Sequence, residues 1–503
     1  MKYKKFIIAI ALILILFASS CNNGPGNANN INNANEDGAK DSNSNLDLNA
    51  DENIETAGEE QKLTVPDLPE TDWNGKEIVF IVRGPAFQEW QSQDIYAEEE
   101  TAEPVNDAVY KRNAILEDRY NFKIKKVDAG GDIQAMADKA IKAGSNDYFV
   151  TMCNTQETNN MAMKGFLSNL NKIQYLDLTR EYWDQNSIYG FTVGGKIMFM
   201  TGDLSIMAND ATWILMFNKN VLQNLQLGDP YESVRNNQWT VDTMYDMMRG
   251  ATKDLDGDGV INGLYDQVGF ATHSTTYDGL FFGSGMRVST MDSDGFPQLA
   301  MNNEKIVTVM EKSLMIMDKA HTYTPPENEQ LAAALAKPFE EDRTLFYGEV
   351  LQCVIRRRNM ETPFGVLPFP KLDANQADYA HMVHVTACMV GVPVSLSDED
   401  RDFTGFVLEA MAAESKNWLV PAYYTTALED KFMRDEESKD MLDIILRTRR
   451  YDLGYVADWG GMFSTYVSTA KKGNADFASV WDKCATKAMT AMEKAADFYR
   501  DLD

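Results

Sequence analysis

The chain has 503 residues and carries 76 acidic against 47 basic side chains, so its formal net charge is −29. This balance argues against a nucleic-acid partner, because phosphate backbones are recruited by fields of Lys and Arg. The same acidity keeps a secreted protein soluble, and it therefore names no function by itself.

The first residues contain the three parts of a secretory signal peptide. A basic start at residues 2–5 precedes an unbroken apolar run over residues 6–17, and small side chains follow at 18–20. An apolar run of this length is too short to span a bilayer comfortably as a helix. Residues 1–20 are therefore expected to be a signal peptide that is removed.

Cys21 comes directly after the signal peptide and resembles the lipid-modified cysteine of bacterial lipoproteins. Ala18 departs from that pattern, in which Leu is usual, so plain cleavage and release stays open as the alternative. Two acyl chains on Cys21 make a stable membrane anchor, since each buried methylene contributes about 0.8 kcal/mol.

Residues 22–72 are expected to be a flexible tether. They contain no aromatic residue and are rich in Asn, Asp, Glu, Gly and Ser, so they cannot bury enough apolar surface to offset the entropy of ordering. About 45 such residues reach roughly 35 to 40 Å, which holds a globular domain clear of a membrane. The remaining residues 73–503 are long enough for two domains or one two-lobed domain.

The first part of this region follows a β-α-β-α-β pattern. Short apolar runs predict strands at 77–82, 122–127 and 148–153, and helical spacing predicts helices over 106–120 and 132–143. An N-cap is expected at Asn106 or Asp107. This order predicts a parallel sheet with right-handed crossovers.

Further along the chain, strands are predicted at 196–200 and 211–218, and a final amphipathic helix is predicted over 477–502. Trp239 with Thr240 opens another helix. Residues 190–197 match the spacing of a phosphate loop except at the last place, and they precede a strand, so we interpret them as a hairpin turn.

The cysteines and histidines show no pattern that is typical of a catalytic or metal site. Four cysteines lie far apart in apolar contexts and are expected to be buried free thiols: Cys153, Cys353, Cys388 and Cys484. No HExxH or GxSxG motif occurs, and acidic residues are too abundant for one pair to be singled out. We expect no catalytic residues.

The strongest local signal is an acidic loop with Gly259 at its sharp turn. Its alternating oxygen ligands could converge on a hard cation, as in an EF-hand-like calcium loop, and they are Asp254, Asp256, Asp258, Asn262 and Asp266. Where such a loop ends in a bidentate Glu, this chain has Tyr265. A structural Ca2+ site and a structural turn rich in Asx residues both stay open. No other cofactor is expected.

Several motifs occur in an order that resembles the extracellular solute-binding family 1 proteins of bacterial ABC importers. They are NDAVYKRN at 106–113 with RYN at 119–121, FNK at 217–219, WTVD at 239–242, DLDGDG at 254–259, FGVLPFPK at 364–371 and ES at 414–415. The resemblance implies an α/β protein with a two-lobed type II periplasmic-binding-protein fold, in which hinge strands join the lobes and the ligand lies in a cleft between them.

The resemblance also implies a function and a location. The ligand is expected to be a sugar or oligosaccharide, which the protein delivers to the permease subunits of an ABC transporter. The protein is expected to be a monomer on the extracellular face of the cell membrane of a Gram-positive bacterium, anchored through Cys21. The implied lobes are 73–205 with 372–420 and 206–371 with 421–503, with the first crossing near 203–213.

Candidate ligand contacts lie near expected strand ends and crossings. Ligands of open parallel sheets bind outside the carboxyl ends of strands, where aromatic rings can cover the apolar faces of sugars. The candidates are Trp90, Asp94, Asn154, Thr155, Asp210, Trp213, Tyr277, Arg287, Asp458 and Trp459. For any one aromatic residue alone, core packing is the more common role. Trp213 is expected to be a stacking platform that is open to water when the cleft is empty.

Two other functions remain open from the sequence. A secreted carbohydrate-active enzyme also carries exposed tryptophans and carboxylates, and it would be recognised by turnover. A sensory or adhesive surface lipoprotein can use the same fold without a transporter, and it would fail to co-purify with a permease.

Overall fold

The structure is a computed structural model that describes residues 63–325, 331–357, 360–428 and 436–502. The predicted signal peptide, Cys21 and nearly all of the predicted tether lie outside these residues. Residues 62–503 form one unit, which is described here by itself. Within the described residues, no helix has both the length and the apolar character that crossing a bilayer requires.

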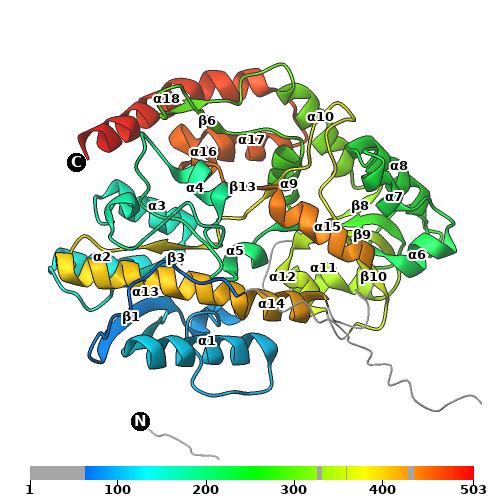
Figure 1. Ribbon diagram of the computed structural model, residues 1–503. Coiled ribbons are helices and arrows are strands. Elements are labelled where there is room, and N and C mark those ends of the chain that lie inside the picture. The colour runs from blue at the N-terminus through cyan, green and yellow to red at the C-terminus, as the bar shows by residue number, and fades with distance from the viewer. Residues whose placement is uncertain (1–62, 326–330, 358–359, 429–435, 503) are drawn as a thin grey trace, which may run out of the picture. The chain divides into compact units, whose positions relative to one another are not determined.

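The predicted parallel sheet is confirmed, with one antiparallel strand added at its edge. It contains β1 (Lys76–Arg83), β2 (Phe122–Ala129), β3 (Val150–Asn154) and β12 (Cys388–Gly391), in the order β12-β3-β1-β2. β1 runs parallel to β2 and β3, whereas β12 runs antiparallel to β3. The carboxyl ends of β1 and β3 therefore lie at the same edge of the sheet (Figure 1).

The helices that pack against this sheet include α1 (Pro104–Tyr120), α2 (Ile133–Lys142), α3 (Thr155–Met163) and α13 (Asp398–Asn417). The predicted cap of α1 was wrong, because the helix begins at Pro104 and its N-cap Glu103 accepts a hydrogen bond from the backbone N–H of Asn106. Proline suits the first helical position, since its fixed φ is already helical and its missing N–H would have no partner there. The cap of α2 is Asp132, at the predicted start.

A second sheet contains β4 (Trp213–Asn218), β5 (Val268–Ala271), β8 (Thr322–Tyr323), β9 (Thr344–Val350) and β10 (Phe364–Leu367), in the order β10-β4-β9-β5-β8. β5 is parallel to β8 and β9, whereas β4 is antiparallel to β9 and β10. Every residue of β4 is buried, which fits a central strand covered on both faces.

The chain crosses between the two sheets through short extended segments. Thr212, just before β4, forms a bridge with Val383, and the backbone N–H of His384 donates to the carbonyl of Ala211 at 2.9 Å. Beside them, β11 (His381–Met382) pairs in parallel with β13 (Arg449–Arg450). Two lobes joined by such crossings can move relative to each other with few changes in backbone angles.

The remaining helices and short strands complete the two lobes. They are the helices α3 (Thr155–Met163), α4 (Gln185–Phe191), α5 (Met207–Asp210), α6 (Lys219–Asn224), α7 (Pro230–Arg235), α8 (Val241–Ala251), α9 (Thr276–Gly283), α10 (Ile306–Ile316), α11 (Leu331–Glu340), α12 (Gln352–Arg356), α14 (Leu419–Leu428), α15 (Glu436–Arg447), α16 (Leu453–Ala457), α17 (Met462–Lys471) and α18 (Phe477–Asp501), the 3-10 turns η1 (Pro85–Trp90), η2 (Leu170–Lys172) and η3 (Trp459–Gly461), and the hairpin of β6 (Ser289–Met291) and β7 (Pro297–Leu299).

The predictions for residues 190–200 are confirmed in one part and wrong in the other. The predicted hairpin turn is confirmed, because Val193 pairs with Lys196 while Gly194 and Gly195 take positive φ angles. The strand predicted at 196–200 does not form. Its side chains are apolar enough to be buried, but its backbone reaches β12 only through the single bridge from Met200 to Val390.

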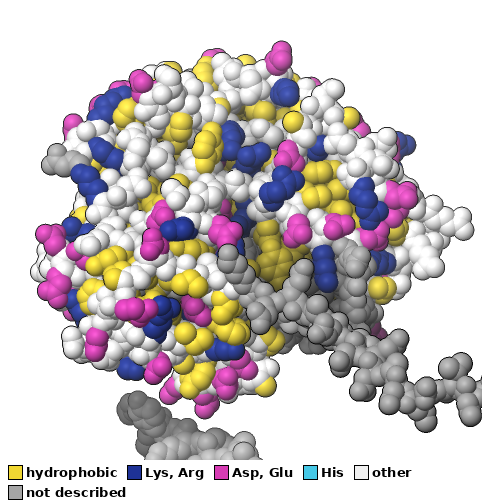
Figure 2. All heavy atoms as spheres, viewed as in Figure 1, with side chains coloured by type: hydrophobic (Ala, Val, Ile, Leu, Met, Phe, Trp, Pro, Cys, Tyr) yellow, Lys and Arg dark blue, Asp and Glu magenta, His cyan; other side chains and the backbone are white. Residues whose placement is uncertain are grey.

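The surface carries both signs of charge. Figure 2 shows Lys and Arg interspersed with Asp and Glu over the visible face, without a continuous basic field. The four cysteines named above are buried free thiols, as predicted.

Candidate functional site

A cavity of about 490 Å³ lies at the carboxyl ends of strands from both sheets. Gln156 comes two residues after β3, Ser274 and Thr275 come shortly after β5, and His384 and Val385 belong to a crossing segment. This is the position that open α/β sheets favour for ligands, and the volume lies in the range of small-molecule sites. We call this cavity the cleft.

The rest of the cleft wall comes from α9 and from the helices that follow the last crossing. Its residues are Asp278 of α9, Tyr455 of α16, Asp458, and Phe463, Ser464, Val467, Ser468 and Lys471 of α17. Segments more than 300 residues apart in the chain, from Gln156 to Lys471, thus contribute to one cavity.

An ion pair lies behind the cleft, between the loop after β5 and the end of β9. The Nε2 atom of His273 is 3.4 Å from Oε2 of Glu349. Burial alone raises the pKa of Glu349, but the hydrogen bond and charge of His273, together with the backbone N–H of Val350 and the charge of Arg356, hold that pKa below its ordinary value. Burial, with the nearby charge of His273, lowers the pKa of His384 to about 4, so this cleft residue is neutral at pH 7.

Asp278 and Tyr455 form a polar pair beside an aromatic wall. The hydroxyl of Tyr455 donates to Oδ2 of Asp278 at 3.4 Å, and burial raises the pKa of Asp278 to about 7 against the opposing charge of Lys471. The rings of Tyr455 and Phe463 meet edge to face, with centroids 5.2 Å apart. The cleft therefore offers both an apolar ring surface and hydrogen-bonding groups.

Asp458 is held in place by a tight turn. It takes a left-handed backbone conformation (φ 40°, ψ 50°), and its Oδ1 atom accepts hydrogen bonds from the backbone N–H groups of Phe463 and Ser464 at 2.9 and 3.2 Å. Gly460, two residues later, has φ +64°, and a Cβ atom there would come within 2.5 Å of the backbone N of Ala488 in α18. The turn is thus fixed by close contact with α18.

Of the predicted ligand contacts, Asp458 lines the cleft, and two others lie directly beside it. Asn154 caps α3 by accepting from the backbone N–H of Glu157 at 2.8 Å. Thr155 is buried and its hydroxyl donates to the carbonyl of Ala387 at 3.0 Å.

Asp94 and Asp210 are buried away from the cleft wall. The Oδ2 atom of Asp94 accepts from the hydroxyl of Ser205 at 2.6 Å and from the backbone N–H of Ile206 at 3.0 Å. This carboxylate therefore links the loop after β1 to the segment before the crossing. Asp210 accepts from the hydroxyl of Tyr423 at 2.8 Å.

The other predicted contacts also lie off the cleft wall. Tyr277 and Trp459 are buried. Trp90 is half-buried, with the guanidinium of Arg356 5.9 Å from its ring centroid. Arg287 donates to the carbonyl of Tyr451 at 3.3 Å.

Trp213 differs from the water-open platform that we expected. Only 1% of it is exposed, its ring meets that of His273 edge to face at 5.0 Å, and a Cβ atom on Gly279 would lie 2.4 Å from its Cδ1. The physical reason is its position as the first residue of central strand β4, where α9 closes over the ring. Among the described residues its indole N–H has no hydrogen-bond partner.

Sequence reasoning missed most of the cleft wall. Gln156 and Ser274 could have been found, because each comes directly after a predicted or apolar strand. The contacts from α17 repeat at helical spacing from Phe463 to Lys471, but the sequence does not say which face of that helix meets the cleft.

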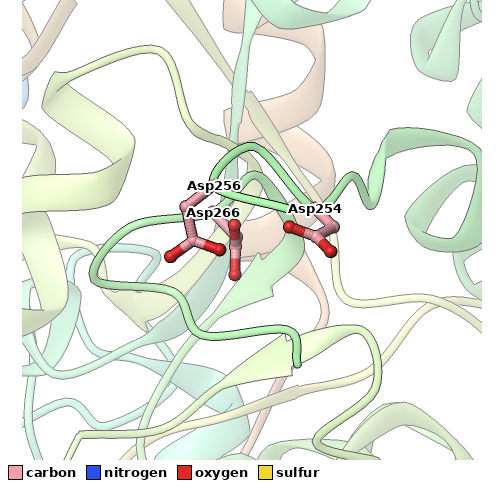
Figure 3. Close-up of side chains that lie close together, drawn as sticks. All are labelled: Asp254, Asp256 and Asp266. Atoms are coloured by element: carbon pink, nitrogen blue, oxygen red, sulfur yellow. The ribbon is translucent and has the colours of Figure 1, made fainter. Parts of the chain in front are cut away.

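The acidic loop between α8 and β5 brings three of its five predicted ligands together. One carboxylate oxygen from each of Asp254, Asp256 and Asp266 lies within 4.8 Å of the others (Figure 3). Asp258 and Asn262 are outside this group, and their side chains accept from the backbone N–H groups two residues ahead. The loop therefore has both an acidic cluster and the Asx turns of the alternative interpretation.

Comparison with known proteins identifies the fold. No family model and no curated protein matches the sequence. Solved structures do match. A cyclo/maltodextrin-binding protein complexed with maltotetraose has 14% identity and a TM-score of 0.53, over 84% of this chain and 97% of that one.

Two further structures agree with it. An ABC substrate-binding protein from Listeria monocytogenes in complex with cycloalternan has 12% identity and a TM-score of 0.51, over 83% of this chain and 99% of that one. UgpB from Mycobacterium tuberculosis in complex with glycerophosphocholine has 15% identity and a TM-score of 0.51, over 78% and 98%. This chain has the two-lobed binding-protein fold. The predicted fold class is confirmed, and at these identities the likeness shows the fold alone.

Proposed function

We propose that the protein is the extracellular substrate-binding component of an ABC importer and that it binds a sugar or oligosaccharide in the cleft. The observation that carries this proposal is the cleft itself, which lies at the carboxyl ends of strands from both lobes and combines polar groups with an aromatic wall. The same fold holds maltotetraose and cycloalternan complexes in the proteins compared above, which supports a carbohydrate ligand.

The cleft has the groups that sugar recognition needs. The amide of Gln156 and the hydroxyls of Ser274, Thr275 and Ser464 can donate to or accept from sugar hydroxyls. The ring of Phe463 can cover an apolar C–H face. A ligand that touches Gln156 and Ser274 together contacts both lobes, so it stabilises the arrangement in which they are close.

Binding without turnover is the simplest use of this site. Asp278 and Asp458 are the two carboxylic acids of the cleft wall, and both hold hydrogen bonds within the protein. Incubation with the bound oligosaccharide, followed by chromatography, tests this part. Release of shorter products would favour a carbohydrate-active enzyme, and failure to co-purify with a permease would favour a sensory lipoprotein.

The decisive experiment is calorimetric titration with a panel of malto-oligosaccharides, cycloalternan and glycerophosphocholine. Gln156→Ala removes an exposed amide from the cleft and is expected to weaken binding by about 1 kcal/mol. Gln223→Ala in α6 removes an equally exposed amide far from the cleft and should leave affinity unchanged. If no carbohydrate of the panel binds, or if both variants behave alike, the proposed site is wrong.

We also propose that Cys21 carries the lipid anchor, which the apolar run and the small residues before it support. Cys21→Ser is expected to release the protein from membranes into the medium, as seen by fractionation and immunoblotting. A wild-type protein that is already free and unlipidated would contradict the anchor.

The acidic loop is proposed to hold a structural Ca2+ ion. The supporting observation is the approach of three carboxylate oxygens within 4.8 Å, because such a group is repulsive without a cation and suits a hard one. Asp254, Asp256 and Asp266 are the proposed ligands.

A further inference from the structure

A second cavity, of about 320 Å³, lies against the segment that leads to the first crossing. Its walls come from the start of α4, from residues 201–209, and from the end of α15 with the residue that opens β13. Asn209 of α5 lines this cavity, whereas His384 of the neighbouring crossing segment lines the cleft. No lining residue is shared between the two, so we treat it as a separate site and call it the hinge cavity.

The two guanidinium groups on the wall of the hinge cavity are already paired. Arg449 lies 2.9 Å from the carboxylate of Asp184 and also donates to the side chain of Asn209. Arg447 lies 3.2 Å from Asp378. With both positive charges matched inside the protein, the hinge cavity has little to attract an anion.

Asp203 is different from these paired residues. Among the described residues, no hydrogen-bond donor reaches its side chain and no cation lies within ion-pair distance. Burial raises its pKa to about 7, although the more distant charges of Lys416 and Arg449 oppose the shift. A cation placed next to this carboxylate would favour its ionised form.

Thr201, two residues away, adds a second unsatisfied group. Thr201 lines the hinge cavity but is only 1% exposed, and its hydroxyl, which is buried from solvent, has no hydrogen-bond partner among the described residues. Buried hydroxyls in proteins almost always have a partner. Among the described residues, this wall of the cavity therefore contains a carboxylate and a buried hydroxyl that both lack a partner.

We propose that the hinge cavity is a second binding site, which takes a small organic amine whose ammonium group pairs with Asp203, beside Thr201. A metal ion is a poorer fit, because hard cations require several converging oxygens and the only such group in the described residues is in the acidic loop. An amine bound here contacts the segment before the crossing. It therefore affects the same movement of the two lobes as a ligand in the cleft.

The test uses two pairs of probes that differ only in charge: ethanolamine against ethylene glycol, and putrescine against 1,4-butanediol. Each is titrated into the mature protein by calorimetry, at a pH above the pKa of Asp203, with the cleft left without sugar. We expect both amines to bind with one-to-one stoichiometry and both diols to fail. Asp203→Asn should weaken amine binding by about tenfold or more, since it removes the charge and keeps the shape.

Two further variants keep the test decisive. Thr201→Val preserves the size of the side chain and should weaken amine binding less than Asp203→Asn does. Asp246→Asn removes an exposed carboxylate of α8 and should change nothing. Thermal unfolding checks that each variant is folded. Amines that do not bind at millimolar concentrations, diols that bind equally well, or an unchanged affinity in Asp203→Asn would each overturn the proposal.

Discussion

The cleft and the acidic loop are built in opposite ways. The acidic loop brings its carboxylates together from a single stretch between Asp254 and Asp266, and its backbone hydrogen bonds are local. The cleft collects Gln156, Ser274, His384 and Lys471 from segments that meet only when both sheets and the last helices have formed. Chemistry held by consecutive residues can be recognised in a sequence, whereas chemistry assembled by the fold cannot.

The largest loss of stability is expected for a substitution at Trp213, behind the cleft. Its ring is buried between β4 and α9, so Trp213→Ala should lower the free energy of unfolding by about 3 to 5 kcal/mol, the usual cost of a large cavity in a core. Chemical denaturation measures this change. A small loss of stability with a large loss of sugar affinity would show instead that the ring contacts the ligand. The prediction from sequence, that Trp213 is a stacking platform, would then be correct.

A substitution at Gly460 is expected to cause the next largest loss of stability. Gly460→Ala places a Cβ atom against the backbone of Ala488 and should destabilise the protein by about 2 to 4 kcal/mol while weakening ligand binding through Asp458.

Gly473→Ala is the matched control for this turn. Gly473 also has a positive φ (+74°), but nothing lies within 4 Å of the added Cβ, so its cost should be limited to about 1 kcal/mol of backbone strain. Equal melting temperatures for the two variants would mean that contact with α18 does not fix the turn.

Calcium binding to the acidic loop is expected to stabilise the folded protein. If the ion binds, a hundredfold excess over the dissociation constant raises stability by about 2.7 kcal/mol, and chelation removes that gain. Asp254→Asn should abolish the response in differential scanning calorimetry.

Asp292→Asn is the control for the calcium experiment. Asp292 also accepts from backbone N–H groups in an exposed turn, but it belongs to no carboxylate group in the described residues. If chelation changes nothing and elemental analysis finds no metal, the acidic loop is only a set of Asx turns.

An effect on stability that is spread over several pH units is expected from the protonation of Asp278. Its pKa is raised to about 7 in the folded state, so the folded protein binds more protons than the unfolded chain between the ordinary pKa of Asp and that value. The stabilisation is complete at low pH and is lost as pH rises toward 7, by about 1 kcal/mol between pH 6 and pH 7.

Asp278→Asn should remove this share of the pH dependence. Denaturant midpoints measured from pH 5 to pH 8 should fall less steeply for the variant than for the wild type. Identical slopes would mean that Asp278 is ionised throughout, and the hydrogen bond from Tyr455 would then be to a charged acceptor.

Local patterns in the sequence determined much of the first lobe. The apolar runs at 77–82 and 122–127 became β1 and β2, and the pattern at 132–143 became α2 with its cap at Asp132, because strand and helix periods and caps depend on residues close in the chain. The resemblance of several short motifs to a known family supplied the two-lobed architecture, which the structure confirms.

Only the tertiary structure decided which residues face the cleft. The sequence shows an aromatic residue at Trp213 and another at Phe463, but burial of the first and the cleft position of the second depend on how α9 and α17 pack against the sheets. Asp203 is an ordinary acidic residue in the sequence, and only the packing around the hinge leaves it without a partner among the described residues. Contacts of this kind depend on long-range packing, which the short-range periods of helices and strands do not specify.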